Sequence, residues 1–226
     1  MNYTIPGGIF YGSAMSGGFT LKEAAAIAEL PESVVRTAIE KKVVAPRFKP
    51  VGKALRYTFE VKELYYVKLL SAFPLDLNRE DKHSLRDLAF RQTKIAGRWR
   101  LEGPDFVLKS GDLVLHLEVK QLRSLLAHNL STYHRGRRRI VSDPNVLGGE
   151  PVFRGTRVPL AHVAAMIARG VDATEILEDY PALSERDLAY AAIHARMKPN
   201  PGRPRKPLEL RRHKADTPAK RATSDR

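Results

Sequence analysis

The amino-acid sequence predicts a mainly α-helical fold with short β-hairpins, an α+β architecture. It has two small winged-helix or helix-turn-helix-like domains joined by a helix-and-strand segment. Capped segments with apolar residues at helical spacing occur towards both ends of the chain. Short apolar runs separated by glycine-containing turns lie between them and predict hairpins. The 226 residues are 43% hydrophobic, which is enough for a core and for one to three small domains.

Composition excludes several classes of protein. The chain has no cysteine, which rules out disulfides, thiol catalysis and zinc held by cysteines. It has no run of about 18 or more apolar residues, so we expect no membrane span. The opening MNYTIPGGIFYG lacks the features of a signal peptide, so we expect a cytoplasmic protein. The seven histidines lack ligand spacing, so we expect no metal site and no cofactor.

The positive charge of the chain is unevenly distributed. The formal net charge is +14, which favours a polyanionic partner, most simply nucleic acid. Residues 198–226 hold ten Lys and Arg against three acids, a net +7, and are rich in proline. We expect this tail to be disordered, because it has too few apolar residues to offset the entropy lost on ordering. A second concentration, Arg135–Arg139, adds +4.

Residues 1–75 are expected to form an N-terminal arm and a winged helix-turn-helix domain. The first 18 residues are rich in glycine and predict an irregular arm. Thr20 and Glu23 have the spacing of a capping box and predict the start of a helix rich in alanine. A proline-containing break separates it from a second helix, which runs from about Glu32 to Lys41. A hairpin with basic residues near its tip and a helix over about 61–72 complete the domain.

This helical pair predicts DNA binding, with the polar face of the second helix in a major groove and the hairpin on the phosphates. The segment TLKEAAAIAELPESVVRTAIEKKVVAP resembles the opening of MerR-like and antitoxin DNA-binding domains. The expected groove contacts are Ser33, Arg36, Thr37 and Lys41, and the expected phosphate contacts are Arg47, Lys49, Lys53 and Arg56. A specific DNA site usually has two half-sites, so we expect a homodimer. A helical pair with no DNA role is the alternative.

Residues 76–135 form the middle segment. They predict a helix near 79–95, strands at 99–101, 105–109 and 113–118, and a helix over 120–133. Asp105, Glu118 and Lys120 match the PD…(D/E)xK pattern of metal-dependent nucleases, in which two carboxylates hold Mg²⁺ beside a lysine. The alternative function is therefore a Mg²⁺-dependent nuclease. Only three residues carry this pattern, and the alternative interpretation is that Glu118 and Lys120 simply lie at a strand end in solvent.

Residues 136–197 predict a compact unit of three helices with a strand arm. A short strand over 151–154 precedes helices over 158–169 and 174–179, and Ser184 caps a last helix that reaches about Met197. Arg157 has two interpretations: it bonds helix-end carbonyls or Asp143, or it contacts DNA phosphate or a protein partner.

This segment closely resembles the domain-of-unknown-function family 433. The motif residues are Asp143, Pro144, Gly148, Gly149, Pro151, Gly155, Thr156 and Arg157, with Ile140, Gly170, Tyr180, Pro181 and Leu183 around them. The resemblance implies a winged-helix-type antitoxin that acts beside a toxin with a PIN-type ribonuclease domain. Together with the N-terminal helical pair, it resembles a VapB-like subgroup that represses its own operon and wraps the toxin. The middle segment and the basic tail have no counterpart in short family members.

The resemblance gives the basic tail a partner. A PIN-type active site carries clustered acids, and an arginine inserted among them would neutralise it. The residues expected to bind the toxin are Arg203, Arg205, Lys206, Arg211 and Arg212. Two alternatives stay open: a DNA-binding regulator without a toxin, and a tail that serves solubility alone.

Overall fold

A computed structural model describes residues 3–5, 9–11, 18–51, 54–73, 77–91, 95–103 and 105–197. In these ranges the protein is mixed α and β, with eight α-helices and small antiparallel sheets. The tail beyond residue 197 lies outside the described residues, so its expected disorder stays a prediction. Two short strands of the arm, β1 (Tyr3–Ile5) and β2 (Ile9–Tyr11), pair antiparallel. None of the helices in the described ranges is long and apolar enough to cross a membrane.

The first two helices form where the sequence predicts them. The capping box of α1 (Leu21–Ala28) is confirmed: the Glu23 amide donates to Thr20 Oγ1 at 3.4 Å, and the Thr20 amide donates to Glu23 Oε2 at 2.7 Å. Glu29 ends α1 in the left-handed conformation, with φ of 52°. The turn leads directly into α2 (Glu32–Glu40).

The predicted hairpin and closing helix follow. Strand β3 (Arg47–Val51) pairs antiparallel with β4 (Ala54–Thr58), and α3 (Val61–Ser71) comes next. An isolated antiparallel bridge joins Phe19, two positions before α1, to Phe59, which directly follows β4 and lies two positions before α3. This bridge therefore links the backbone that leads into α1 to the backbone that leaves the hairpin.

The middle segment contains one helix and a four-stranded sheet. Helix α4 (Arg79–Arg91) ends four residues before its predicted end, because Ile95 enters the sheet instead. The strands are β5 (Ile95–Ala96), β6 (Trp99–Glu102), β7 (Asp105–Ser110) and β8 (Leu113–Leu117), in the order β5-β6-β7-β8. Trp99 is fully buried under α4 and its indole N–H donates to the Asp81 carbonyl at 3.1 Å. Strand β5 was not predicted.

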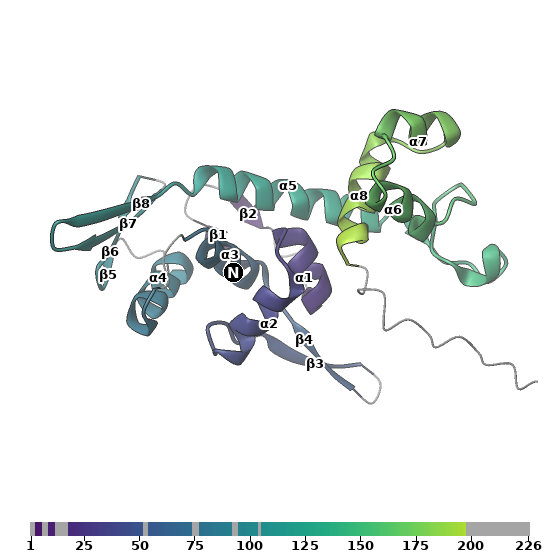
Figure 1. Cartoon of the computed structure of the whole chain (residues 1–226). Coiled ribbons are helices and arrows are strands. Elements are labelled where there is room, and N and C mark those ends of the chain that lie inside the picture. The colour runs from purple at the N-terminus through teal and green to yellow at the C-terminus, as the bar shows by residue number, and fades with distance from the viewer. Residues whose placement is uncertain are drawn as a thin grey trace, which may run out of the picture.

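Helix α5 (Lys120–Arg137) connects the sheet to the C-terminal region, as Figure 1 shows. It contacts α1, α3 and α8. It also extends four residues beyond its predicted end and takes in most of the Arg135–Arg139 segment. The expected boundary between residues 135 and 136 therefore falls inside a continuous helix.

The C-terminal region has the three predicted helices. Strands β9 (Ile140–Val141) and β10 (Val152–Phe153) pair antiparallel, with a short 3₁₀ turn, Leu147–Gly149, between them. Helices α6 (Leu160–Ala168), α7 (Ala173–Asp179) and α8 (Glu185–Arg196) follow. Ser184 caps α8 as predicted, accepting from the Asp187 amide at 3.4 Å. Most of the packing in this region is between α6 and α8.

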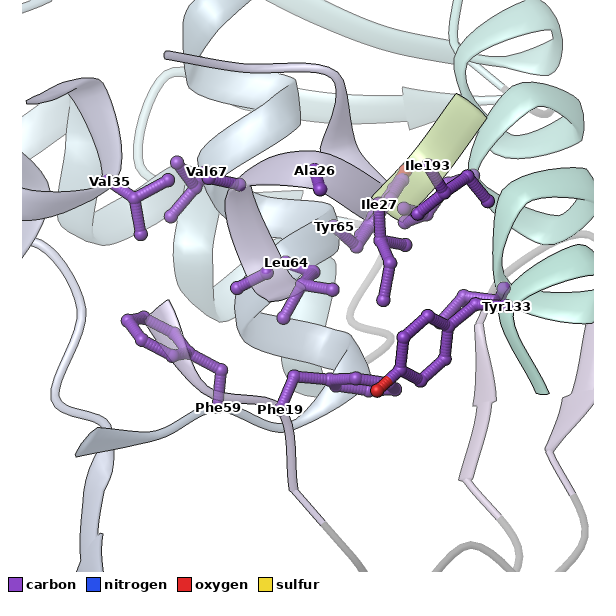
Figure 2. Close-up of a cluster of buried hydrophobic side chains, with 14 of the residues drawn as sticks. Phe19, Ala26, Ile27, Val35, Phe59, Leu64, Tyr65, Val67, Tyr133 and Ile193 are labelled. Carbon is purple, nitrogen blue, oxygen red and sulfur yellow. The ribbon is translucent and has the colours of Figure 1, made fainter. Parts of the chain in front are cut away.

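One hydrophobic cluster runs through all of these parts. It includes Phe19, Ile27 of α1, Leu64 of α3, Tyr133 of α5 and Ile193 of α8, which Figure 2 shows together. Ile27 is fully buried, and the other four are at most 3% exposed. Helices from the N-terminal and C-terminal regions thus share a core across α5.

Candidate nucleic-acid interface

The helix α2 rests on α1 by a narrow face. Residues Ala24 to Ala28 of α1 are all buried, and four of the five are alanines, which lets a second helix approach closely. Val35 is the buried residue of α2, at 2% exposed. Most of the surface of α2 therefore faces solvent.

The four predicted groove contacts lie on that exposed surface. Ser33, Arg36 and Thr37 are exposed and lie three to four residues apart, so they share a side of the helix. Lys41, also exposed, caps the C-terminal end. The Arg36 guanidinium pairs with Glu32 at 2.9 Å, with 57% and 40% of the two side chains exposed. An exposed pair of this kind contributes at most about 1 kcal/mol, so Arg36 can exchange it for a phosphate or a base.

The hairpin carries part of the predicted phosphate-binding set. Arg47 and Arg56 are exposed, and Arg47 pairs with Glu60 at 2.9 Å. The strand register sets Lys49 opposite Arg56, while Lys53 lies outside the described residues. Phe48 was not among the predicted site residues; it is 60% exposed, and its ring centroid lies 4.9 Å from that of Tyr57. This aromatic pair stiffens the hairpin beside its basic residues.

The family-motif residues build turns. Gly148, Gly149 and Gly155 have φ of 66°, 88° and 79°, which only glycine adopts without strain. The Asp143 carboxylate accepts from the Asn145 amide at 2.9 Å, which closes an Asx turn. The Thr156 hydroxyl donates to the Phe153 carbonyl at 2.8 Å and accepts from the Val158 amide at 3.1 Å.

The remaining motif side chains face solvent. Pro144, Pro151 and Arg157 are exposed. Within the described ranges Arg157 forms no hydrogen bond or ion pair, so the expected bond to Asp143 or to helix-end carbonyls is not formed. A binding role for Arg157 stays a prediction.

An ion pair between the partly exposed Arg139 and the buried Asp187 joins the residue before β9 to the first turn of α8. Arg139 Nε lies 3.2 Å from Asp187 Oδ1, and its Nη2 lies 3.3 Å from Oδ2. Only 2% of the Asp187 side chain is exposed. Burial alone would raise the pKa of Asp187, but the hydrogen bonds from Arg139 and Ser184 outweigh it and hold the pKa below its usual value. Arg139 is thus a structural residue of the predicted basic segment.

The nuclease pattern is only partly assembled. The register pairs Phe106 of β7 with Leu117 of β8, so Asp105 and Glu118 are the next residues beyond this pair on the two strands. However, Asp105 Oδ1 accepts from the Val119 amide at 3.1 Å, which occupies this carboxylate at the start of α5. Glu118 and Lys120 are exposed. Among the described residues, no group of three or more His, Cys, Asp or Glu side chains is arranged to hold a metal ion.

The predicted toxin contacts of the tail, Arg203 to Arg212, lie outside the described residues. The structure therefore shows the α2 residues and Arg47 and Arg56 of the hairpin to be exposed, and it leaves their joint use, the tail and Lys53 as predictions.

Comparison with known proteins identifies the C-terminal region. Residues 140–195 match the model of the family described as "Protein of unknown function (DUF433)". An uncharacterized protein, y4eO of Sinorhizobium fredii, is 44% identical over 66 residues, which are 29% of this chain and 30% of that protein's length. A crystal structure of Rv2018 from Mycobacterium tuberculosis aligns with 85% of this chain and 99% of that chain, at 17% identity and a TM-score of 0.32. Residues 140–195, from β9 to α8, therefore form a DUF433 domain.

Proposed function

We propose that this protein is a non-enzymatic, DNA-binding antitoxin that represses its own operon and neutralises a PIN-domain ribonuclease. The observation that supports DNA binding most directly is the exposed polar face of α2, which packs on the small-residue helix α1 and is followed in the chain by a basic hairpin. This is the arrangement that presents a helix to a major groove and a hairpin to the flanking backbone.

In this proposal α2 recognises the base sequence of the DNA, and the hairpin positions the protein on the DNA by contacting phosphates. Arg36 reads a base edge through its guanidinium fork, with Ser33 and Thr37 beside it. Arg47 and Arg56 neutralise phosphates on either side of the groove. A symmetrical DNA site is bound by a homodimer, in which each copy supplies one α2.

The antitoxin part rests on the DUF433 domain and on the resemblance of the whole arrangement to VapB-like proteins. The basic tail is the segment that inserts arginines among the carboxylates of the ribonuclease. The partner is the product of the neighbouring gene, encoded beside this chain.

DNA binding is tested with the upstream region of the operon as the duplex. We expect Arg36→Ala to weaken binding by about 1–3 kcal/mol, roughly 5- to 150-fold. Lys22→Ala removes one exposed charge from the opposite helix and serves as the matched control, with less than about a two-fold effect. Fluorescence anisotropy measures both affinities, and circular dichroism checks that both variants fold. If Arg36→Ala and Lys22→Ala bind the duplex with equal affinity, α2 is not part of the DNA interface.

Toxin neutralisation is tested by ending the chain after residue 197. The truncated protein should lose inhibition of the neighbouring ribonuclease and keep its preference for the operator. A truncated chain that inhibits as well as the full chain would place the inhibitory segment elsewhere. Because the proposal is non-enzymatic, plasmid incubated with the protein and Mg²⁺ should stay intact. Cleavage by the wild type that a Glu118→Ala variant lacks would instead establish a nuclease.

A further inference from the structure

A wide hollow opens where the C-terminal end of α5 meets the strand arm and the first turn of α8. Its volume is about 1070 Å³. Side chains from residues 128–140, from β10's end and from the start of α8 line it. The lining contains six arginines, Arg135, Arg137, Arg138, Arg139, Arg154 and Arg186, against two carboxylates, Glu185 and Asp187.

One of the six arginines is neutralised within the protein. Arg139 is held by the buried Asp187 described above. Two others bond only neutral groups: Arg137 Nη1 donates to the Tyr133 hydroxyl at 3.3 Å, and Arg154 Nη2 donates to the Arg138 carbonyl at 3.2 Å. These bonds orient both guanidinium groups, and neither group forms an ion pair with a described residue.

The other three arginines have no partner in the part of the chain that the structure describes. Arg135, Arg138 and Arg186 are exposed, and their guanidinium groups form no hydrogen bond or ion pair with another described residue. Five guanidinium groups in the lining therefore form no ion pair with a described residue. Glu185 is the one carboxylate in the lining that also forms none. The C-terminal end of a helix stabilises a nearby cation by about 0.3–1 kcal/mol, and only within its last turn. This effect explains one or two of the arginines at the end of α5, but not all five around the hollow.

We propose that this hollow binds phosphate groups of a DNA backbone, as a second contact beside the α2 interface. The inference deepens the proposed DNA binding and rests on it. Guanidinium groups bind phosphate oxygens in a bidentate manner, and several of them around one hollow suit consecutive phosphates. The hydroxyls of Ser131 and Thr132 line the same hollow and add neutral donors of the kind that contact DNA backbones, whereas the Ser184 hydroxyl already donates to Asp187 Oδ2 at 2.8 Å.

The composition of the lining favours a backbone over other anions. Its apolar side chains are Ile140 and Ala189, and no Phe, Tyr or Trp is among the residues that line it. A small-molecule site is lined mainly by apolar and aromatic groups, and a protein partner is normally anchored by Trp or Tyr as well as by Arg. Stacking of unpaired bases is normally carried by several aromatic rings, whereas His128 is the one aromatic ring in this lining. Contact with the phosphates of a duplex needs none of these, so binding here should not depend on base sequence.

The test compares two triple variants of the full chain. Arg135→Ala/Arg138→Ala/Arg186→Ala removes the three arginines without partners. Lys22→Ala/Arg79→Ala/Arg169→Ala removes three exposed charges that do not line the hollow. Each protein is titrated by fluorescence anisotropy against the operator duplex and against a duplex of unrelated sequence, over a series of salt concentrations. Thermal melting by circular dichroism checks folding, and we expect no loss of stability in either variant.

We expect the hollow variant to lose affinity for both duplexes by the same factor, about 10- to 100-fold. Its slope of log affinity against log salt should become shallower by up to about 3, since each phosphate contact contributes about 0.9. The control should stay within about two-fold. A third variant with lysine at all three positions keeps the charges and should restore most of the slope.

The outcomes separate this inference from the proposed function. Wild-type affinity and slope in the hollow variant would overturn the inference and leave α2 binding intact. An unchanged Arg36→Ala variant beside a weakened hollow variant would instead contradict the proposed reader helix. A hollow variant that binds DNA normally but no longer inhibits the ribonuclease would assign the hollow to an acidic protein partner, which also overturns the inference.

Discussion

Replacing Gly136 by alanine sets two effects of opposite sign against each other. Alanine favours a helix interior over glycine by about 1 kcal/mol, so an unobstructed substitution would stabilise α5. A Cβ at Gly136, however, would lie 2.1 Å from Cγ of Tyr190 and 2.3 Å from its Cβ. These atoms are close to the backbone of α8 and cannot swing away as the end of a flexible chain does. The two helices must therefore separate.

The magnitude follows from these two effects. Overpacking a well-packed interior costs about 1–3 kcal/mol, and contacts this short place the cost at the upper end. After the gain in helix propensity, we expect a net loss of about 2 kcal/mol in the free energy of unfolding. For a chain of this size that lowers the melting temperature by about 4–8 °C.

Urea and thermal unfolding followed by circular dichroism measure this loss. The decisive comparison introduces Gly136→Ala into a Tyr190→Ala variant, because Tyr190→Ala removes the ring atoms that the new Cβ would meet. In that background Gly136→Ala should be neutral or stabilising by about 1 kcal/mol. A single Gly136→Ala variant that melts at or above the wild-type temperature would show that α5 and α8 do not cross at this residue.

Two further predictions concern buried ionisable groups. Asp187→Ala removes the ion pair with Arg139 and the bond from the Ser184 amide that completes the capping box of α8, and should cost about 2–3 kcal/mol in urea unfolding near neutral pH. Because the folded-state pKa of Asp187 is lowered, its contribution is present above the usual value of 3.8 and is lost as the pH falls through the folded-state pKa. An Asp187→Ala variant whose stability falls as steeply in acid as the wild type would refute this. His134 has its pKa lowered by burial and by the charges of Arg137 and Arg138. The unfolded chain therefore takes up a proton more readily, and the wild type should lose stability as the pH falls below about 6.5, which His134→Phe should lessen. Equal pH slopes between about pH 7 and pH 5 would contradict this role of His134.

Local signals in the sequence located most of the elements. The capping boxes at Thr20 and Ser184 predicted the starts of α1 and α8, because a cap depends on residues three positions apart. The glycines of the family motif predicted turns for the same kind of reason, since a positive φ is a property of a single residue.

Local sequence signals could not predict the features that depend on contacts between distant segments of the chain. Helix α5 continues through Gly136 and Arg137 because Gly136 fits against Tyr190, a contact between residues far apart in the chain. The two-residue strands β5 and β9 exist only through their partners. The arginine-lined hollow likewise joins residues 135–139 to Arg154 and Arg186, so the sequence showed a run of positive charge where the structure shows a site.

The shared packing of α5 has a consequence for how the chain can be divided. The DUF433 domain begins at residue 140, after α5 ends, yet the ring of Tyr190 lies 6.0 Å from that of Tyr133 in α5. Arg196 also pairs with Glu29, just past α1, at 2.9 Å. A fragment cut out at the family boundary would expose the apolar side of α8 that α5 and α1 cover in the whole chain. Such a surface promotes aggregation or false pairing in solution. The sequence boundary of the family is therefore a poor place to divide this protein, and a fragment that keeps α5 and α1 retains the surfaces that its last helix needs.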